Sequence, residues 1–307
     1  MDRLEKKAYA KVNITLDVLG RRDDGYHLVQ MIMHSVGLYD VLTFERIPDG
    51  EGKIYLSAKN PDELDSLVTM DEKNLIYRAA AMLYEAYGIK DSVKIVLEKN
   101  IPVAAGLAGG STDAAAAFKG INELFGLDIP IYELCNYGAK LGADIPYCIQ
   151  GGTMLSEGIG EILTKLPDFP KAYFVLAKPE CAVSTAEVYR GIDAYDIKEH
   201  ERPLTQGILD VLYDLEENSD DPELDMSDDA LDIIGECMAN VLELVTVPIH
   251  PEIGKIKDIM TENGAVRAMM SGSGPTVFGI FRDVETAKAA GAAVTESGLA
   301  KNVYVLD

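Results

Sequence analysis

The sequence predicts an α+β protein with two domains. Its 307 residues are about twice the length of a typical domain. Segments with the alternating apolar pattern of strands and segments with the period of amphipathic helices occur in both halves. Two glycine pairs and two prolines between residues 151 and 170 mark a border between the halves. We therefore expect one domain at 1–155 and the other at 156–307.

The N-terminal half begins with strands and continues with helices. AKVNITLDVLG has apolar residues at every second position from Val12 to Val18, as a half-buried strand does. The polar turn RRDDGYH follows it and leads into a second apolar segment, MIMHSVGLYDVLTFERI. Asn74 can cap a helix that runs through Tyr87 and stops at Gly88. After the strand SVKIVLEKN, we expect helices from about 111 to 124 and from about 131 to 141.

The C-terminal half has strands at both ends and helices between them. AYFVLAKP, AVRAMM, TVFGIF and NVYVLD are typical of strands, and SGSGP joins the middle two. One helix is predicted to begin at 227–229 and to carry apolar residues as far as Val245 on one face, and another runs from Pro251 to Gly264. The acidic segment around 215–229 is predicted to be a solvated loop.

Charge and composition narrow the classes of partner. The net charge of −23 disfavours a nucleic-acid partner, because a phosphate backbone would be repelled. An anionic small molecule remains possible, since the first 22 residues hold six cations against three anions. No apolar run is long enough to span a membrane, and the N-terminus lacks the apolar core of a signal peptide. The four cysteines show no zinc-binding spacing, so we expect a cytoplasmic protein with reduced thiols and no structural metal.

The segment IPVAAGLAGGSTDAAAA, which begins at Ile101, is almost free of side-chain bulk. Glycines here precede a run of strong helix formers, and the start of a helix carries unpaired N–H groups and a partial positive charge. Small residues let an anion reach those donors, which predicts a phosphate-binding loop. A tight loop packed against a neighbouring helix explains the glycines equally well. The spacing matches neither the P-loop pattern nor GxGxxG, and HRD and DFG triplets of protein kinases are absent from the sequence.

Three segments together resemble the GHMP kinase superfamily. PVAAGLAGGSTDAAAA resembles its phosphate-loop motif. AYAKVNITLDVLGRRDDGYHLVQMIMHSVGLYD, which ends in LYD, and MMSGSGPTVFGIF resemble its first and third motifs. RRDDGYH and LGADIPY are similar to the branch of the superfamily that phosphorylates a cytidine diphosphate sugar alcohol in non-mevalonate isoprenoid synthesis. The resemblance implies a ribosomal-protein-S5-like N-terminal domain and a ferredoxin-like C-terminal domain.

The resemblance implies ATP with Mg²⁺ as the phosphoryl donor and assigns roles to several residues. Lys11 would stabilise the migrating charge, although a lysine in a strand is more often a surface residue. Asp144 would be the general base, although an aspartate before a proline is more often a turn or cap residue. The ATP phosphates would bind the loop formed by Pro102, Val103, Ala104, Ala105, Gly106, Leu107, Ala108, Gly109, Gly110, Ser111 and Thr112.

The same resemblance places the cytidine end of the substrate on three side chains. Tyr26 would stack on the cytosine, His27 would hydrogen-bond to it, and Tyr189 would be the second aromatic residue of this clamp. Asn13 shares a face of its strand with Lys11 and would orient the substrate. SGSGPT would support the phosphate loop.

Two departures from the superfamily pattern bear on the loop. Ala104, Ala105 and Ala108 stand where many members have glycine, and alanine adopts a positive φ only at a cost. Asp113 replaces the asparagine of several relatives, which suggests either that it stabilises the start of the helix or that its side chain is turned away from the nucleotide. No glutamate is obviously placed to hold Mg²⁺, so the metal is expected on the triphosphate, with Ser111 as a further ligand candidate.

Two other functions are compatible with the sequence. One is a different GHMP enzyme, such as a homoserine or mevalonate kinase, which RRDDGYH disfavours. The other is a binding protein without catalysis, which the presence of both Lys11 and Asp144 disfavours. A monomer or a homodimer is expected.

Overall fold

The computed structural model describes residues 2–64, 66–218 and 227–307. The strands are β1 (Arg3–Arg21), β2 (His27–Ile47), β3 (Ile54–Ala58), β4 (Ser92–Glu98), β5 (Thr153–Glu157), β6 (Ile162–Lys165), β7 (Tyr173–Lys178), β8 (Arg267–Met270), β9 (Val277–Phe281) and β10 (Asn302–Leu306). The α-helices are α1 (Leu75–Tyr87), α2 (Gly109–Phe125), α3 (Ile131–Ala139), α4 (Ile145–Gln150), α5 (Thr185–Ile192), α6 (Thr205–Glu217), α7 (Ser227–Cys237), α8 (Glu243–Ile249), α9 (Pro251–Glu262) and α10 (Val284–Ser297). Short 3₁₀ helices occupy Pro61–Glu63 and Glu199–Glu201.

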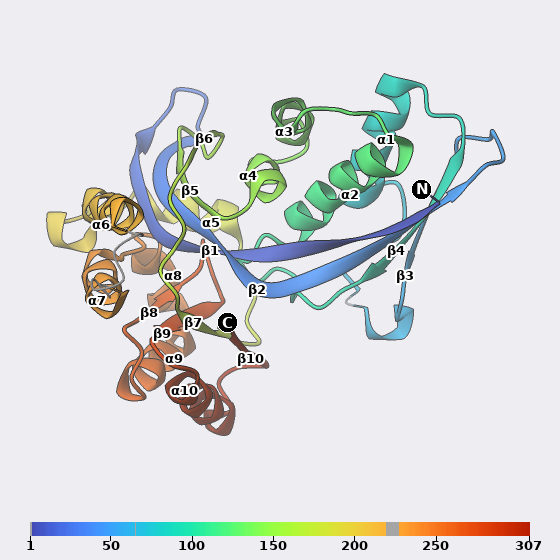
Figure 1. Cartoon of the computed structure of the whole chain (residues 1–307). Helices are drawn as coiled ribbons and strands as arrows, with labels where there is room; N and C mark the ends of the chain where they lie inside the picture. The colour runs from blue at the N-terminus through green and yellow to red at the C-terminus, as the bar shows by residue number, and fades with distance from the viewer. Residues whose placement is uncertain (1, 65, 219–226) are drawn as a thin grey trace. The chain divides into compact units, whose positions relative to one another are not determined.

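The chain forms two compact units that are each discontinuous in sequence. The first holds Met1–Ala10, Leu38–Val103 and Ala108–Gly151, and the second holds Lys11–Gly37, Ala104–Leu107 and Gly152–Asp307. The long strands β1 and β2 therefore contribute residues to both units. Figure 1 follows the chain through its elements in sequence order.

The first unit places helices α1–α4 on one face of a small sheet (Figure 1). In this sheet β2 pairs antiparallel with β4, from Val41↔Glu98 to Ile47↔Ser92, and β3 pairs parallel with β4. Helix α2 approaches β2 so closely that a Cβ on Gly120 would lie 2.4 Å from Phe44 Cζ. A residue without a side chain is thus required where this helix crosses the sheet.

The predicted ends of α1 are confirmed. Asn74 lies in extended backbone at the N-cap, and its side chain accepts a hydrogen bond from the N–H of Ile76. Gly88 follows the helix in the left-handed conformation, which a glycine adopts without steric cost. Helix α2 also ends as expected, at a left-handed Gly126.

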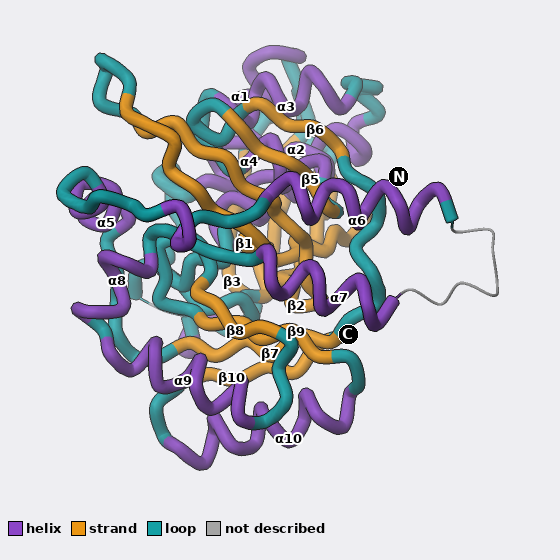
Figure 2. The backbone as a smooth tube through the Cα atoms, turned by 90° about the vertical axis from the view of Figure 1, so that its left-hand side faces the viewer, coloured by secondary structure: helices purple, strands orange, loops and turns teal. Residues whose placement is uncertain are grey.

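The second unit contains a four-stranded antiparallel sheet in the order β10-β7-β9-β8. Helices α9 and α10 pack on one face of it (Figure 2). Renumbered within the sheet, the strand order is 4-1-3-2, which is the ferredoxin-like arrangement that the sequence predicted. The remaining strands of this unit continue from β2 through β5 to β6.

The predicted long helix from 227 to Val245 is wrong. The structure has two helices instead, because the helical conformation is interrupted between Cys237 and Glu243. Asn240 in the break donates from Nδ2 to the carbonyls of Met270 and Gly272, both at 2.8 Å, and bridges to Leu16. These tertiary hydrogen bonds replace helical ones, and nothing in the local apolar period signals them.

The acidic segment is only partly described. Its first residues belong to α6 rather than to a loop, and Ser227 begins α7. Residues 219–226, on which the rest of the loop prediction falls, lie outside the described residues. Among the helices that are described, none combines the length and the apolarity that crossing a membrane requires.

Candidate active site

The predicted phosphate loop ends at an open helix start. Ala108 is the N-cap of α2, and its side chain offers no capping hydrogen bond. The N–H groups of the first turn thus receive no help from an N-cap side chain, as a site for an anion requires. Ser111 lies in this first turn and is half-buried. The neighbouring Thr112 is buried, and its hydroxyl donates to the carbonyl of Tyr9 at 2.7 Å.

The loop adopts left-handed backbone at two alanines as well as at a glycine. Its positive φ angles are 51° at Ala104, 75° at Gly106 and 57° at Ala108. For an L-residue this conformation costs roughly 1–2 kcal/mol, because Cβ approaches the following carbonyl oxygen. The sequence predicted that a positive φ at an alanine of this loop would be costly, but it did not show that Ala104 and Ala108 both adopt one. The surrounding contacts hold the loop in a strained shape.

Gly106 is required for packing. A Cβ there would lie 2.5 Å from the carbonyl oxygen of Ser271 and 2.9 Å from that of Gly274. The hydroxyl of Ser271 also donates to the carbonyl of Gly106 at 3.0 Å, and the N–H of Thr276 donates to the carbonyl of Ala105 at 3.4 Å. The SGSGPT turn thus supports the loop. Close packing accounts for this glycine, but the packing partner is a turn and not the helix that was expected, and phosphate binding by the loop stays a prediction.

Lys11 lies beside the same loop and is buried. Its backbone N–H donates to the carbonyl of Leu107 at 3.2 Å. Only 5% of the residue is exposed, so its side chain has little contact with solvent. Its ammonium donates to Asn13 Oδ1 at 2.7 Å. A Cβ added to Gly272 would lie 3.8 Å from Lys11 Nζ and 3.5 Å from the carbonyl oxygen of Gly106. Residues of the first, second and third motif segments therefore meet at one place.

Lys11 belongs to the second unit, and no carboxylate among the described residues of that unit forms an ion pair with it. A buried ammonium without an anion is costly, because it has lost water and gained no opposite charge. Such a group is poised to receive an anionic ligand. Asn13 holds it in place, with its Nδ2 directed at the sulfur of Met31, 3.1 Å away. The predicted contact of Asn13 with substrate remains a prediction.

A buried cluster of one lysine and two aspartates lies in the first unit, between the end of β4 and the first turns of α2. Lys99 Nζ is 2.5 Å from Asp40 Oδ2 and 2.6 Å from Asp113 Oδ2, and all three side chains are at most 10% exposed. Asp40 Oδ1 accepts from the N–H groups of Asn100 and Ile101. The cluster therefore ties the chain that enters the loop to the first turns of α2. Asp113 thus contacts Lys99, and its orientation towards a nucleotide stays a prediction.

One lysine cannot neutralise two carboxylates. Burial raises the pKa of Asp113 well above its ordinary value, with Lys99 opposing this shift and Asp40 adding to it. Burial lowers the pKa of Lys99, but the two carboxylates outweigh it and the net change is upward. Asp113 Oδ1 is buried without a hydrogen-bond partner. The protonated form of Asp113 is therefore favoured in the folded protein.

Asp144 stands immediately before α4 in the first unit. The residue is the N-cap by position, yet its side chain makes no capping hydrogen bond. It is half-buried. The turn-or-cap explanation thus accounts for its backbone and not for its carboxylate, which is free to act on a ligand. Its role as base remains a prediction.

Two of the three residues predicted to bind cytosine, His27 and Tyr189, are in contact in the second unit. The rings of His27 and Tyr189 lie 5.2 Å apart at an angle of 39°. His27 Nε2 is 2.7 Å from Asp193 Oδ1, and Arg21 donates to the other oxygen of Asp193 at 3.0 Å. Tyr26 is 60% exposed. The structure brings two of the three clamp residues together and leaves the third on the surface.

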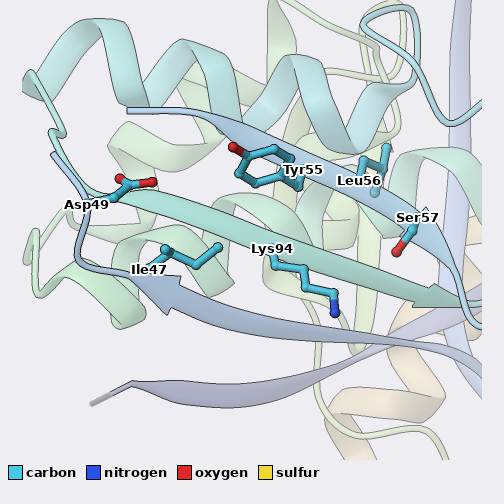
Figure 3. A pocket seen from close by; sticks show the side chains of 6 residues that line it. All are labelled: Ile47, Asp49, Tyr55, Leu56, Ser57 and Lys94. Atoms are coloured by element: carbon cyan, nitrogen blue, oxygen red, sulfur yellow. The ribbon is translucent and has the colours of Figure 1, made fainter. Parts of the chain in front are cut away.

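A shallow hollow of about 460 Å³ lies elsewhere in the first unit, on strands β2, β3 and β4 (Figure 3). Tyr55 and Lys94 are register partners in it, and the other lining residues are Ile47, Asp49, Leu56 and Ser57. None of the residues predicted to bind ATP or substrate lines this hollow. It is open and carries no group that the predicted chemistry needs.

The sequence analysis missed several residues that shape the site. Lys99 and Asp40 support the loop, Asp193 orients His27, and Asn240 holds the third motif segment. Asp40 stands in the LYD of the first resemblance, so a motif signal was present for it. Asp193 and Asn240 stand in no recognisable pattern and are found only from the tertiary contacts.

Comparison with known proteins is consistent with this geometry. The family models for the GHMP kinases N terminal domain and the GHMP kinases C terminal domain match residues 74–152 and 227–299. The 4-diphosphocytidyl-2-C-methyl-D-erythritol kinase of Lachnospira eligens is 43% identical over 307 residues, which cover 100% of this chain and 99% of the relative. The enzyme of the same name from Clostridium botulinum is 47% identical over 278 residues, or 91% of each chain.

Solved structures agree with the sequence relatives. A crystal structure of 4-(cytidine 5'-diphospho)-2C-methyl-D-erythritol kinase superposes with a TM-score of 0.77 at 29% identity and covers 99% of this chain and 98% of that one. A homoserine kinase from Cytophaga hutchinsonii superposes with a TM-score of 0.72 at 20% identity, covering 100% and 95%. The second likeness concerns the fold alone.

The strained alanine at the helix start gives a stability prediction. We expect Ala108→Gly to stabilise the protein by about 0.5–1 kcal/mol, since glycine adopts the left-handed conformation without the Cβ clash but is more flexible when unfolded. Ala289→Gly, in the exposed interior of α10, is the control and should destabilise by about 1 kcal/mol. Thermal unfolding measures both. A lower melting temperature for Ala108→Gly would contradict the strain.

The charge cluster gives a prediction of pH dependence. Because the folded pKa of Asp113 is raised, the unfolded chain loses this proton near the ordinary value while the folded chain keeps it. The wild-type protein is therefore destabilised as pH rises from about 4 towards the folded pKa. Asp113→Asn cannot titrate, so its melting temperature relative to wild type should increase over this range. Asp258→Asn, which removes an exposed carboxylate, is the control. A wild-type protein that is more stable than Asp113→Asn at pH 7 would show that Lys99 keeps Asp113 ionised.

Proposed function

Because this chain belongs to the 4-diphosphocytidyl-2-C-methyl-D-erythritol kinase family of the GHMP kinases, we propose that Lys11 and Asp144 act on the acceptor hydroxyl while the loop at 102–112 holds ATP. The reaction transfers the γ-phosphoryl group of ATP to the 2-hydroxyl of 4-diphosphocytidyl-2-C-methyl-D-erythritol. The products are the 2-phosphate and ADP, and the step belongs to non-mevalonate isoprenoid synthesis. Positioning and charge stabilisation supply most of the rate enhancement in such transfers.

The observation that carries the assignment is the buried ammonium of Lys11 beside the loop. It has no carboxylate partner among the described residues of its unit, and it lies close to Gly272 of the third motif segment, while the backbone N–H of Lys11 donates to Leu107 of the loop. The negative charge that moves from ATP to the acceptor oxygen would supply the missing anion. Asn13 fixes the ammonium, so little reorganisation is needed when the charge arrives.

The loop binds the phosphates through the N–H groups at the start of α2. The strained backbone at Ala104 and Ala108 presents these donors, and the packing of Gly106 against the SGSGPT turn holds the loop in this shape. The Lys99 cluster fixes the chain on both sides of the loop. The phosphates therefore meet preorganised donors, which is the condition for strong electrostatic stabilisation.

Asp144 takes the proton of the acceptor hydroxyl as the phosphoryl group is transferred. Its carboxylate is half-buried and engaged in no helix cap. A carboxylate is a weak base towards an alcohol, so it acts only when the oxygen has begun to bond to phosphorus. The 2-hydroxyl is a tertiary alcohol, which makes accurate alignment of the nucleophile more important.

The tautomer of His27 determines which hydrogen bond its ring can make with cytosine. Asp193 accepts from Nε2, so Nε2 carries a proton and Nδ1 is left as an acceptor in the neutral ring. An acceptor at Nδ1 suits the exocyclic amino group of cytosine, which is a donor. Tyr189 lies against the ring of His27, and the exposed Tyr26 is available to cover the other face of the base. Asp193 is thus a positioning residue.

Mg²⁺ accompanies ATP in this proposal and neutralises part of its phosphate charge. The fitting protein group is the hydroxyl of Ser111 in the first turn of α2. Among the described residues, the only cluster of three metal-binding side chains is far along the sequence from this turn, at 181–252. The phosphates themselves therefore supply most of the oxygen ligands that this ion prefers.

The base assignment is tested by steady-state kinetics with the cytidyl substrate. Asp144→Asn should lower kcat by at least about 100-fold and leave ATP binding intact, because the amide cannot accept the proton. Asp258→Asn, on the exposed face of α9, should leave kcat unchanged. Turnover by Asp144→Asn at the wild-type rate would remove this assignment. Binding of both substrates by the wild type without ADP release would point to a non-catalytic protein.

The clamp is tested by comparing the KM values of the two substrates. Asp193→Asn frees the tautomer of His27, so the KM for the cytidyl substrate should rise about tenfold, roughly the value of one hydrogen bond, with the KM for ATP unchanged. Tyr26→Ala should act in the same direction by removing a stacked ring. Asp196→Asn, an exposed residue of the same segment, is the control. Equal effects on both KM values would rule out the clamp.

A further inference from the structure

The second unit contains a group of three metal-binding side chains outside the proposed active site. Cys181, His250 and Glu252 come from two distant segments, and one ligand atom of each lies within 4.8 Å of the other two. Cys181 lies between β7 and α5, His250 separates α8 from α9, and Glu252 is in the first turn of α9. The proposed phosphoryl transfer uses none of them.

We propose that Cys181, His250 and Glu252 form a binding site for Zn²⁺. A thiolate, an imidazole and a carboxylate are ligands that zinc accepts, and zinc sites with three protein ligands keep a fourth position for water. A sulfur ligand disfavours Mg²⁺ and Ca²⁺, which bind oxygen. The sequence spacing gave no sign of this site, because the cysteine is remote from the other two ligands along the chain.

The distances are close to those of a zinc site. With metal–ligand bonds of about 2.0–2.3 Å, two ligands of a tetrahedral zinc ion lie about 3.4–3.7 Å apart. His250 Nδ1 and Glu252 Oε1 are already 3.4 Å apart. The other pairs are within 4.8 Å, so a side-chain movement of about 1 Å completes the geometry.

The site is accessible and its groups are now hydrogen-bonded to one another. The side chains of His250 and Glu252 are 24% and 28% exposed, which leaves room for the ion and a water ligand. Burial and a hydrogen bond to Glu252 raise the pKa of the Cys181 thiol to about 12. The thiol therefore keeps its proton in the metal-free protein, and a bound zinc ion displaces that proton to solvent as the sulfur–zinc bond forms.

A bound ion would connect two parts of the second unit. It would join the segment that leads into α5 to the junction of α8 and α9. Helix α8 packs against both α5 and α9. Helix α5 carries Tyr189 of the clamp. The site is therefore placed to stiffen the element that presents this ring, without contact with the reacting groups.

Metal titration of the chelator-treated full chain tests the proposal. Zn²⁺, competed against a chromophoric chelator, should bind with one high-affinity equivalent. Cys181→Ser and His250→Gln should each weaken that binding by at least about 100-fold, the upper end of the loss that follows removal of an outer-shell partner. Cys135→Ser and His200→Gln remove one cysteine and one histidine elsewhere and should leave it unchanged.

Two further measurements keep the test decisive if a variant folds poorly. Co²⁺ in place of zinc should give a sulfur-to-cobalt charge-transfer band that Cys181→Ser abolishes and Cys135→Ser retains. Glu252→Gln, which keeps the size of the side chain, should also weaken zinc binding and reduce the rise in melting temperature that zinc gives the wild type. Absence of stoichiometric binding, or binding that the ligand variants leave unchanged, would show that the three groups form only a hydrogen-bonded cluster.

Discussion

The close approach of Gly106 to the Ser271–Gly274 backbone is the contact on which the proposed site depends. It leaves no space for a side chain, so the loop and the SGSGPT turn share one surface. The backbone of Lys11 joins the loop at Leu107, next to this contact. Segments that are far apart in the sequence thereby become neighbours within the second unit, and the buried Lys11 lies beside the loop at Leu107.

Burial has opposite consequences for the two lysines near this loop. Lys99 contacts the carboxyl groups of Asp40 and Asp113, so it is a structural group that fixes the chain beside the loop. Lys11 has an amide as its neighbour and no carboxylate among the described residues of its unit. A buried cation that lacks an anion costs stability, and proteins keep such groups where a ligand provides the opposite charge. The same residue type thus supports the loop in one case and is available for chemistry in the other.

Motif residues were the part of the site that could be predicted from the sequence. Lys11, His27 and Tyr189 stand in motifs, so a role could be predicted for each, and the structure places the ring of His27 against that of Tyr189. Their partners Asp193 and Asn240 could not be named, because a single side chain that orients another leaves no periodic or compositional signal. The break in the predicted helix after Cys237 has the same origin, since Asn240 gives up helical hydrogen bonds for contacts with residues 270–272.

The sequence by itself determined the class of fold, the ends of helices such as α1 and the family, because apolar periods, caps and motifs are local properties of the chain. Tertiary structure alone decided which charges are compensated, which alanines bear a positive φ and which cysteine lies beside a histidine and a glutamate. These depend on the distances between residues remote along the chain. Such distances follow from packing, and no local pattern encodes them.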